Sequence, residues 1–187
     1  VNESACSRLT ARDAALTNII DRISQALVAL QGSMGTTATQ TVRDQAAMSF
    51  EGIRDALAAD INLGFGGTRI FSGTNSSMPA YAKVGGAWTY QGTNAPMTVD
   101  VADNRQVTIA MDGQAIMQGS DPSDLLTTLD GLATAARTND TVTLNTGLTL
   151  LNNAFTRATR AQSRVGNDET TVDDTNERLA TMRLAAA

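Results

Sequence analysis

Apolar side chains recur every three or four residues between Leu144 and Leu179, and this is the longest periodic pattern in the sequence. A seven-residue repeat keeps one narrow stripe of a helix facing its neighbour over many turns. If residues 140–183 form one helix, its length is about 65 Å at about 1.5 Å per residue. We therefore expect a rod, with Phe155 in its packed seam. One column of the stripe repeats every seven residues, at Leu151, Ala158, Val165, Val172 and Leu179.

Two further helical patterns precede the middle of the chain. The first alternates steps of three and four, and its members are Cys6, Leu9, Asp13, Leu16, Ile20, Ile23, Leu27 and Leu30. The polar member, Asp13, either fixes the register against a partner or faces outward where the helix drifts. Residues 32–35 end this helix, and a threonine among residues 36–39 can cap the next one. The second helix should end at residues 64–67, and its apolar face is formed by Val42, Ala46, Phe50, Ile53, Leu57 and Ile61.

The period changes from helical to two between residues 68 and 119. Alternating apolar and polar side chains there are typical of half-buried strands. We expect strands at residues 70–71, 88–90, 98–101 and 106–111. Glycine, aspartate and asparagine pairs predict tight turns at residues 85–86, 103–104 and 112–113.

The helical period returns after residue 119. We expect Ser120 and Asp121 to cap a short helix that Pro122 opens, and residues 139–140 to restart the chain into the long final helix. The predicted fold class is mainly α with a small β insert, as an elongated antiparallel helical bundle (rod) capped by a small β domain. Residues 1–67 form the N-terminal half of the rod, residues 68–119 the β insert, and residues 120–187 the C-terminal half.

Composition excludes several classes of function. The formal net charge is −5, so we expect no nucleic-acid partner, because such a partner requires a cationic face. No apolar run is long enough to span a bilayer, and no membrane association is expected. The chain contains no histidine and a single cysteine, Cys6, which we interpret as a small apolar seam residue. We therefore expect no enzyme activity, no catalytic residue, no cofactor and no metal ion.

The long helical pattern also carries the most charged stretch. Its acidic group lacks the alternating loop of calcium sites and is better interpreted as a solvated helix face; it comprises Asp168, Glu169, Asp173, Asp174 and Glu177. Just before it, Arg157, Arg160 and Arg164 form a positive stripe. If identical subunits stack along the rod axis, the positive block of one could meet the negative block of the next. Plain solvation of both blocks is the alternative.

Four short motifs carry a resemblance to a known family. The strongest is the run NLGFGGTRIFSGT at residues 62–74, where a helix passes into a strand. The others are YQG at residues 90–92, DG at residues 112–113 and RAQSRVG at residues 160–166. With these motifs the sequence resembles the flagellin superfamily of bacterial filament proteins over essentially its whole length, and within it the hook–filament junction proteins.

The resemblance implies helices that pack into the wall of a tubular filament, a β domain displayed outside, and no catalytic activity. It also implies export through the flagellar secretion apparatus, with an export chaperone, and an extracellular location on the flagellum. The implied partners are further copies of the chain in a ring or tube, a neighbouring hook-associated protein, and flagellin. Because helical patterns run close to both ends, we expect a monomeric piece of a longer chain whose terminal assembly helices lie beyond it.

Two alternatives remain open. Filament flagellins carry an Arg-Glu pair before a Leu-Ala-Val-Gln run in the first helix, whereas residues 26–31 here read ALVALQ, which favours the junction proteins. A surface glycan-binding protein or hydrolase could instead use Trp88, Tyr81 and Tyr90 as a carbohydrate platform, although Trp88 can equally anchor the core of the small sheet. Residues 75–77 fit the N-glycosylation pattern, to which we assign no function.

Overall fold

The computed structural model describes residues 2–102 and 104–185. The helices in these residues are α1 (Asn2–Met34), α2 (Gln40–Ile61), α3 (Gly113–Met117), α4 (Leu125–Thr138) and α5 (Thr141–Ala185). The strands are β1 (Gly64–Phe65), β2 (Thr68–Arg69), β3 (Tyr81–Val84), β4 (Ala87–Tyr90), β5 (Met97–Ala102) and β6 (Arg105–Ala110). We refer to β1–β6 together with α3 as the β unit.

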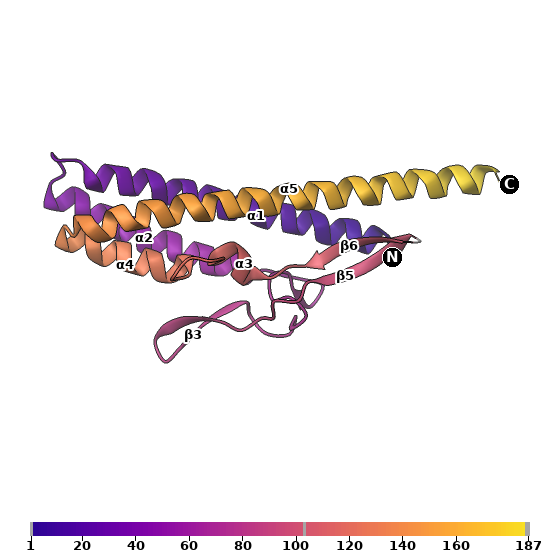
Figure 1. Ribbon diagram of the computed structural model, residues 1–187, viewed down its shortest axis with the longest axis horizontal. Coiled ribbons are helices and arrows are strands. Elements are labelled where there is room, and N and C mark those ends of the chain that lie inside the picture. Colours follow the sequence, from indigo (N-terminus) through magenta and orange to yellow (C-terminus); the bar gives the residue numbers. More distant parts are fainter. Residues whose placement is uncertain (1, 103, 186–187) are drawn as a thin grey trace.

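The four long helices form an up-and-down bundle, which confirms the predicted rod (Figure 1). Helix α1 packs against α2 and α5, and α4 packs against the same two helices on the other side. Because α2 and α4 are shorter, only one half of the rod contains four helices. In the other half α1 and α5 continue as a pair, with the β5–β6 hairpin packed along them. The β unit follows α2 and precedes α4 in the chain, so it caps the end of the two shorter helices, α2 and α4.

Helix α5 is a single element of 45 residues, as its periodicity predicts. The side chains of Leu151, Ala158, Val165 and Val172 are fully buried. The column ends at Leu179, which is 39% exposed, because α5 extends past the N-terminal end of α1 (Figure 1).

The expectation that Phe155 lies in the seam of α5 is wrong, because its side chain is 37% exposed. The neighbouring positions Leu151, Ala154 and Ala158 fill the seam at that level. Phe155 follows Ala154 directly, and one residue turns a helix by about 100°. Its side chain therefore falls at the edge of the apolar stripe.

The seam of α1 differs from the predicted stripe in one of its two columns. The column at Leu9, Leu16, Ile23 and Leu30 is buried as expected. The second column lies one residue earlier than predicted, at Ala5, Arg12, Ile19 and Ala26, whereas Cys6, Asp13, Ile20 and Leu27 are only partly buried. Both columns satisfy alternating steps of three and four, so the pattern cannot separate them. A buried arginine therefore occupies the position that the sequence assigned to Asp13.

The helix ends follow capping chemistry, with one displacement from the predicted boundaries. Thr39 caps α2 by accepting a hydrogen bond from the Val42 amide at 3.3 Å, in agreement with the sequence. The cap of α4 is Asp124, which accepts from the Thr127 amide at 2.9 Å. Ser120 and Asp121 were expected in that role, but they belong to the preceding turns. Asp140 accepts from the first amides of α5, at 3.1 and 3.2 Å.

Within the described residues, the strands pair as three separate antiparallel hairpins rather than as one sheet. Strands β4, β5 and β6 match predicted strands, and β3 pairs with β4 across the expected turn at Gly85 and Gly86. Residues 70–71 were expected to form a strand, but they are a buried connection, and the short β1–β2 hairpin lies just before them. The expected turn at residues 112–113 instead opens α3. Of the turn expected at residues 103–104, Asp103 lies outside the described residues.

Within the described residues, none of the helices has the length and apolar character needed to cross a bilayer.

Candidate functional site

Three of the four motifs that carry the family resemblance, at residues 62–74, 90–92 and 112–113, meet at the base of the β unit, whereas the fourth, at residues 160–166, lies on α5. Ser72 and Asp112 form a β-bridge, and the Gly73 amide donates a hydrogen bond to the Met111 carbonyl at 2.9 Å. The Gly113 amide donates to the Phe71 carbonyl at 2.9 Å. The Thr93 amide donates to the Ser72 carbonyl at 3.1 Å. Three segments far apart in sequence are thus joined mainly through their backbones.

Glycine is required at two positions of this base by close approach. Gly73 adopts φ +59°, and a side chain there would overlap the backbone and the side chain of Thr93. A Cβ atom on Gly92 would overlap the Tyr90 hydroxyl and lie 2.9 Å from the Cα atom of Ser72. The motif glycines therefore build a tight structural junction between chain segments.

The aromatic residues of the proposed carbohydrate platform do not share an exposed surface. Tyr81 is buried, and its ring lies 5.4 Å from that of Tyr90 at a tilt of 50°. The Tyr90 hydroxyl faces the carbonyls of Phe71 and Thr93, at 3.2 and 3.1 Å. Burial raises the pKa of both phenols, so both stay neutral at physiological pH. Trp88 is half-buried, and Lys83 lies over its ring.

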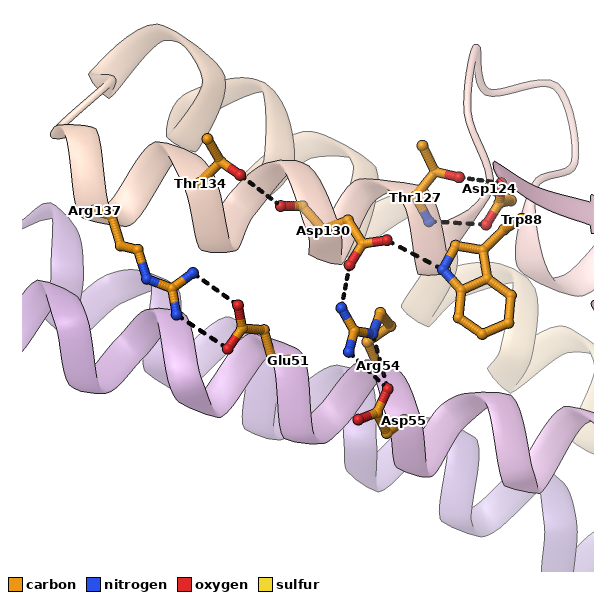
Figure 2. A network of polar contacts seen from close by, with 9 residues as sticks. All are labelled: Glu51, Arg54, Asp55, Trp88, Asp124, Thr127, Asp130, Thr134 and Arg137. Carbon is orange, nitrogen blue, oxygen red and sulfur yellow. Dashed lines mark hydrogen bonds and ion pairs between the residues drawn. The ribbon is translucent and has the colours of Figure 1, made fainter. Parts of the chain in front are cut away.

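Trp88 instead fastens the β3–β4 hairpin to the bundle (Figure 2). Its indole N–H donates a hydrogen bond to Oδ2 of Asp130 on α4 at 3.1 Å. The other oxygen of Asp130 accepts a hydrogen bond from Arg54 of α2, which also pairs with Asp55 at 2.8 Å. Hydrogen bonding to Asp130 raises the pKa of Arg54. One carboxylate thus connects two helices and a hairpin.

A second contact in Figure 2 joins the same two helices further along. Arg137 of α4 donates two hydrogen bonds to the carboxylate of Glu51 on α2, at 2.7 and 3.0 Å. These bonds lower the pKa of Glu51. The pair is well exposed, and such surface pairs contribute little to the free energy of unfolding.

Arg12 connects α1, α5 and β6, although the sequence pattern does not single it out. Its guanidinium donates to the Thr108 carbonyl and lies 3.7 Å from a carboxylate oxygen of Asp168. Burial lowers the pKa of Arg12, although Asp168 opposes this effect. Burial likewise raises the pKa of Asp168, against the influence of Arg12. The available signal was the spacing from Leu9 and Leu16, which Arg12 fits as well as Asp13 does.

Asp13 lies at the edge of the interface between α1 and α5. It accepts a hydrogen bond from the Gln162 side chain at 3.2 Å. Asp13 therefore lies at the edge of the packed stripe and not within it, and it contacts a helix of the same chain.

The arginine stripe of α5 borders a groove beside the β unit. Arg157 donates to the Ile116 carbonyl at 3.0 Å and pairs with Asp121 at 2.5 Å. Arg160 and Arg164 are exposed and form no ion pair within the described residues. The space between α5, α3 and β6, which we call the arginine groove, has a volume of about 430 Å³. Its charged lining residues are Arg12, Asp112, Arg157, Arg160, Arg164 and Asp168.

The acidic group of α5 is divided by the fold. Asp168 turns inward to Arg12, whereas Asp173, Asp174 and Glu177 are exposed. Burial and the nearby carboxylate of Asp13 raise the pKa of Glu169. In the part of the chain that the structure describes, no group of three or more acidic, cysteine or histidine side chains is placed to hold a metal ion.

Neither a scan of protein-family models nor a search of curated proteins gives a match. Among solved structures, hook-associated protein 3 of Legionella pneumophila superposes with a TM-score of 0.87 at 10% identity, covering 99% of this chain and 92% of that one. This chain has the fold of a flagellar hook-associated protein. FlgL of Xanthomonas campestris gives a TM-score of 0.89 at 14% identity, covering 99% and 93% of the two chains.

A second Legionella pneumophila structure, of the flagellar junction protein FlgL, gives a TM-score of 0.79 at 10% identity, with coverages of 92% and 93%. The hook-associated fold thus confirms the resemblance predicted from the motifs. In this fold the polar clusters described above hold helices and hairpins to one another.

Proposed function

We propose that this chain is a structural component of the bacterial flagellum that joins the hook to the filament. The observation that carries the proposal is the likeness of nearly the whole chain, bundle and β unit together, to a flagellar hook-associated protein and a flagellar junction protein. Three of the four family motifs support it, because they build the base of the β unit. A role of this kind requires contact surfaces and does not require catalysis.

The proposed mechanism is helix packing between subunits. Residues 1–67 and 120–187 would supply the rod, and residues 68–119 the β domain displayed on its side. The partners would be further copies in a ring or tube, the neighbouring hook-associated protein, and flagellin. Many weak contacts repeated around a ring act together, so modest pairwise affinities suffice.

The proposed location is outside the cell, on the flagellum. The chain would travel through the flagellar secretion apparatus, accompanied by an export chaperone before export. In the unfolded chain, the apolar residues that α1 buries in the bundle are exposed, and they are a suitable target for such a chaperone.

The test is to label flagella isolated from the bacterium that encodes the chain, using an antibody raised against the β unit. We expect one labelled band per flagellum, at the boundary between hook and filament. Label along the whole filament would identify a filament flagellin instead. Flagella that carry no label, or cells that carry it elsewhere on the surface, would overturn the flagellar assignment. A strain lacking the gene is the control for antibody specificity.

A further inference from the structure

Two exposed charged pairs on α5 have the same internal spacing. Arg160 and Arg164 are four residues apart and border the arginine groove. Asp173 and Glu177 are also four residues apart and lie further along the same helix. Each member of one pair precedes its counterpart by 13 residues. At about 1.5 Å and 100° per residue, the two pairs are separated by roughly 20 Å along α5 and by about 140° around it.

The two stripes lie on opposite flanks of the buried seam. The arginine flank faces the β unit, because Arg157 on the same stripe binds the Ile116 carbonyl of α3. On the acidic flank, Asp173 lies on the side of α1, because Gln162 at nearly the same helix angle bonds Asp13 and Thr17, whereas Glu177 lines a hollow with Arg105 of β6. Both stripes are therefore available to neighbours on different sides of the rod.

Local ion pairs leave positive charge in the arginine groove. Asp121 pairs with Arg157, Asp168 pairs with Arg12, and Asp112 accepts from the Gln114 amide at the start of α3. Arg160 and Arg164 form no ion pair among the described residues. The buried Nε of Arg12, which also lines the groove, has no hydrogen-bond partner there either. The groove thus presents two exposed guanidinium groups without an ion pair in the described structure, those of Arg160 and Arg164, alongside the carboxylate of Asp112.

The acidic stripe likewise carries carboxylates without cationic partners in the described part of the chain. Asp173 and Glu177 are exposed and form no ion pair within residues 2–102 and 104–185. Arg105 and Arg178 line the same shallow hollow as Glu177. They do not come within ion-pair distance of it.

We propose that the arginine groove of one copy binds the Asp173–Glu177 stripe of a second, parallel copy displaced by about 20 Å along the rod. This inference rests on the proposed function, since it names the surface through which neighbouring subunits meet. Equal four-residue spacing lets both charge pairs form at once. The contact is heterologous, because different surfaces of the two copies meet, and such contacts generate rings or helical tubes.

The first experiment reverses charge in the full chain, expressed in its own bacterium. Arg160→Glu with Arg164→Glu should reduce the number of hooks labelled at the boundary at least about tenfold, because like charges then face each other. Asp173→Arg with Glu177→Arg should cause the same loss. All four changes together should restore labelling, since the pairs re-form with inverted sign. Arg160→Lys with Arg164→Lys, which keeps the charge, is the matched control and should assemble.

A loss of labelling in these variants can be assigned to assembly if the variants fold normally. The altered side chains are exposed and without ion pairs in the described structure, so purified variants should melt at the wild-type temperature. If both charge-reversed variants label hooks as the wild type does, the inference is overturned while the proposed function stands. If the arginine variant fails and the fourfold variant does not restore labelling, the groove binds another acidic protein, and the second-copy proposal is also overturned.

The second experiment does not depend on where the protein is located. In a Cys6→Ser background, Arg160→Cys and Asp173→Cys are combined in one chain, which keeps Arg164 and Glu177 to guide the contact. Mild oxidation of the concentrated purified protein should give a ladder of covalent oligomers, because the contact is heterologous. Each single-cysteine variant should give far less product. Equal yields from the single and double variants would contradict the proposed contact even if the flagellar location is correct.

Discussion

Arg12 occupies a position that a helical seam normally gives to an apolar side chain. It is tolerated there because its head reaches the Thr108 carbonyl and Asp168, while its stem lies among buried residues. Removal of one partner from such a group leaves the others buried without compensation, which costs more than the intact interaction contributes. At this scale, a single side chain links the first helix, the last helix and the β unit.

Arg12→Met should lower the free energy of unfolding by about 1–3 kcal/mol at pH 7, because the Thr108 carbonyl and Asp168 lose their donor. The loss should shrink as the pH falls toward 4. Burial already holds the pKa of Asp168 above its ordinary value of 3.8, and loss of Arg12 raises it further. The folded state then binds the proton more tightly than the unfolded state, so stability falls as the pH rises through that window.

Chemical denaturation of Arg12→Met between pH 4 and pH 7 measures this effect. Arg12→Met combined with Asp168→Leu, which replaces both charges by apolar side chains, should regain most of the stability and lose the extra pH dependence. A deficit in Arg12→Met that is constant with pH would show that Asp168 is not the partner left uncompensated.

Helix α5 shows how far sequence periodicity determines an element. Its existence, length and main column follow from the seven-residue repeat, because α1 and α4 both require a continuous apolar stripe. Its edges do not follow, since Phe155 is apolar in sequence and lies just outside the stripe. The same limit shifts one column of α1 by a residue, where Arg12 and Asp13 fit the spacing equally. Periodicity thus gives the axis of packing, and contacts with other elements decide the edges.

Replacing Leu151 and Phe155 by aspartate should separate seam from edge on successive turns of α5. Leu151→Asp should cost at least about 3 kcal/mol or prevent folding, because the charge is buried without a partner. Phe155→Asp should cost less than about 1 kcal/mol, because the new carboxylate can reach water. Thermal unfolding followed by circular dichroism measures both. Similar melting temperatures for the two variants would contradict the described orientation of α5.

The whole molecule is a rod that carries hairpins on its side, and few polar contacts decide how firmly they are held. Sequence motifs indicated the β unit and its turns, but its division into separate hairpins depends on distant partners such as Asp130. The sequence predicted only one of the two walls of the arginine groove. Its stripe on α5 could be recognised, whereas its other wall comes from α3, a helix that the local pattern did not predict.

Asp130→Ala should loosen the β3–β4 hairpin without melting the rod. The change removes the acceptor that Trp88 and Arg54 share, so amides of β3 and β4 should exchange with solvent several-fold faster while α1 and α5 retain protection. Glu51→Ala is the control, because it removes a carboxylate from the same pair of helices without touching the hairpin. Hydrogen exchange measured by mass spectrometry distinguishes the two, and equal hairpin exchange would exclude Asp130 as its anchor.

The pairing of α1 with α5 has a consequence for the order of synthesis. The ribosome makes the first helix of the bundle long before its main partner, which begins only at Thr141. Until then, α1 can pack against α2 but not against α5, with which it shares its longest interface. Completion of the native topology therefore waits until α5 has been made, and a nascent or threaded chain stays open to capture throughout that interval.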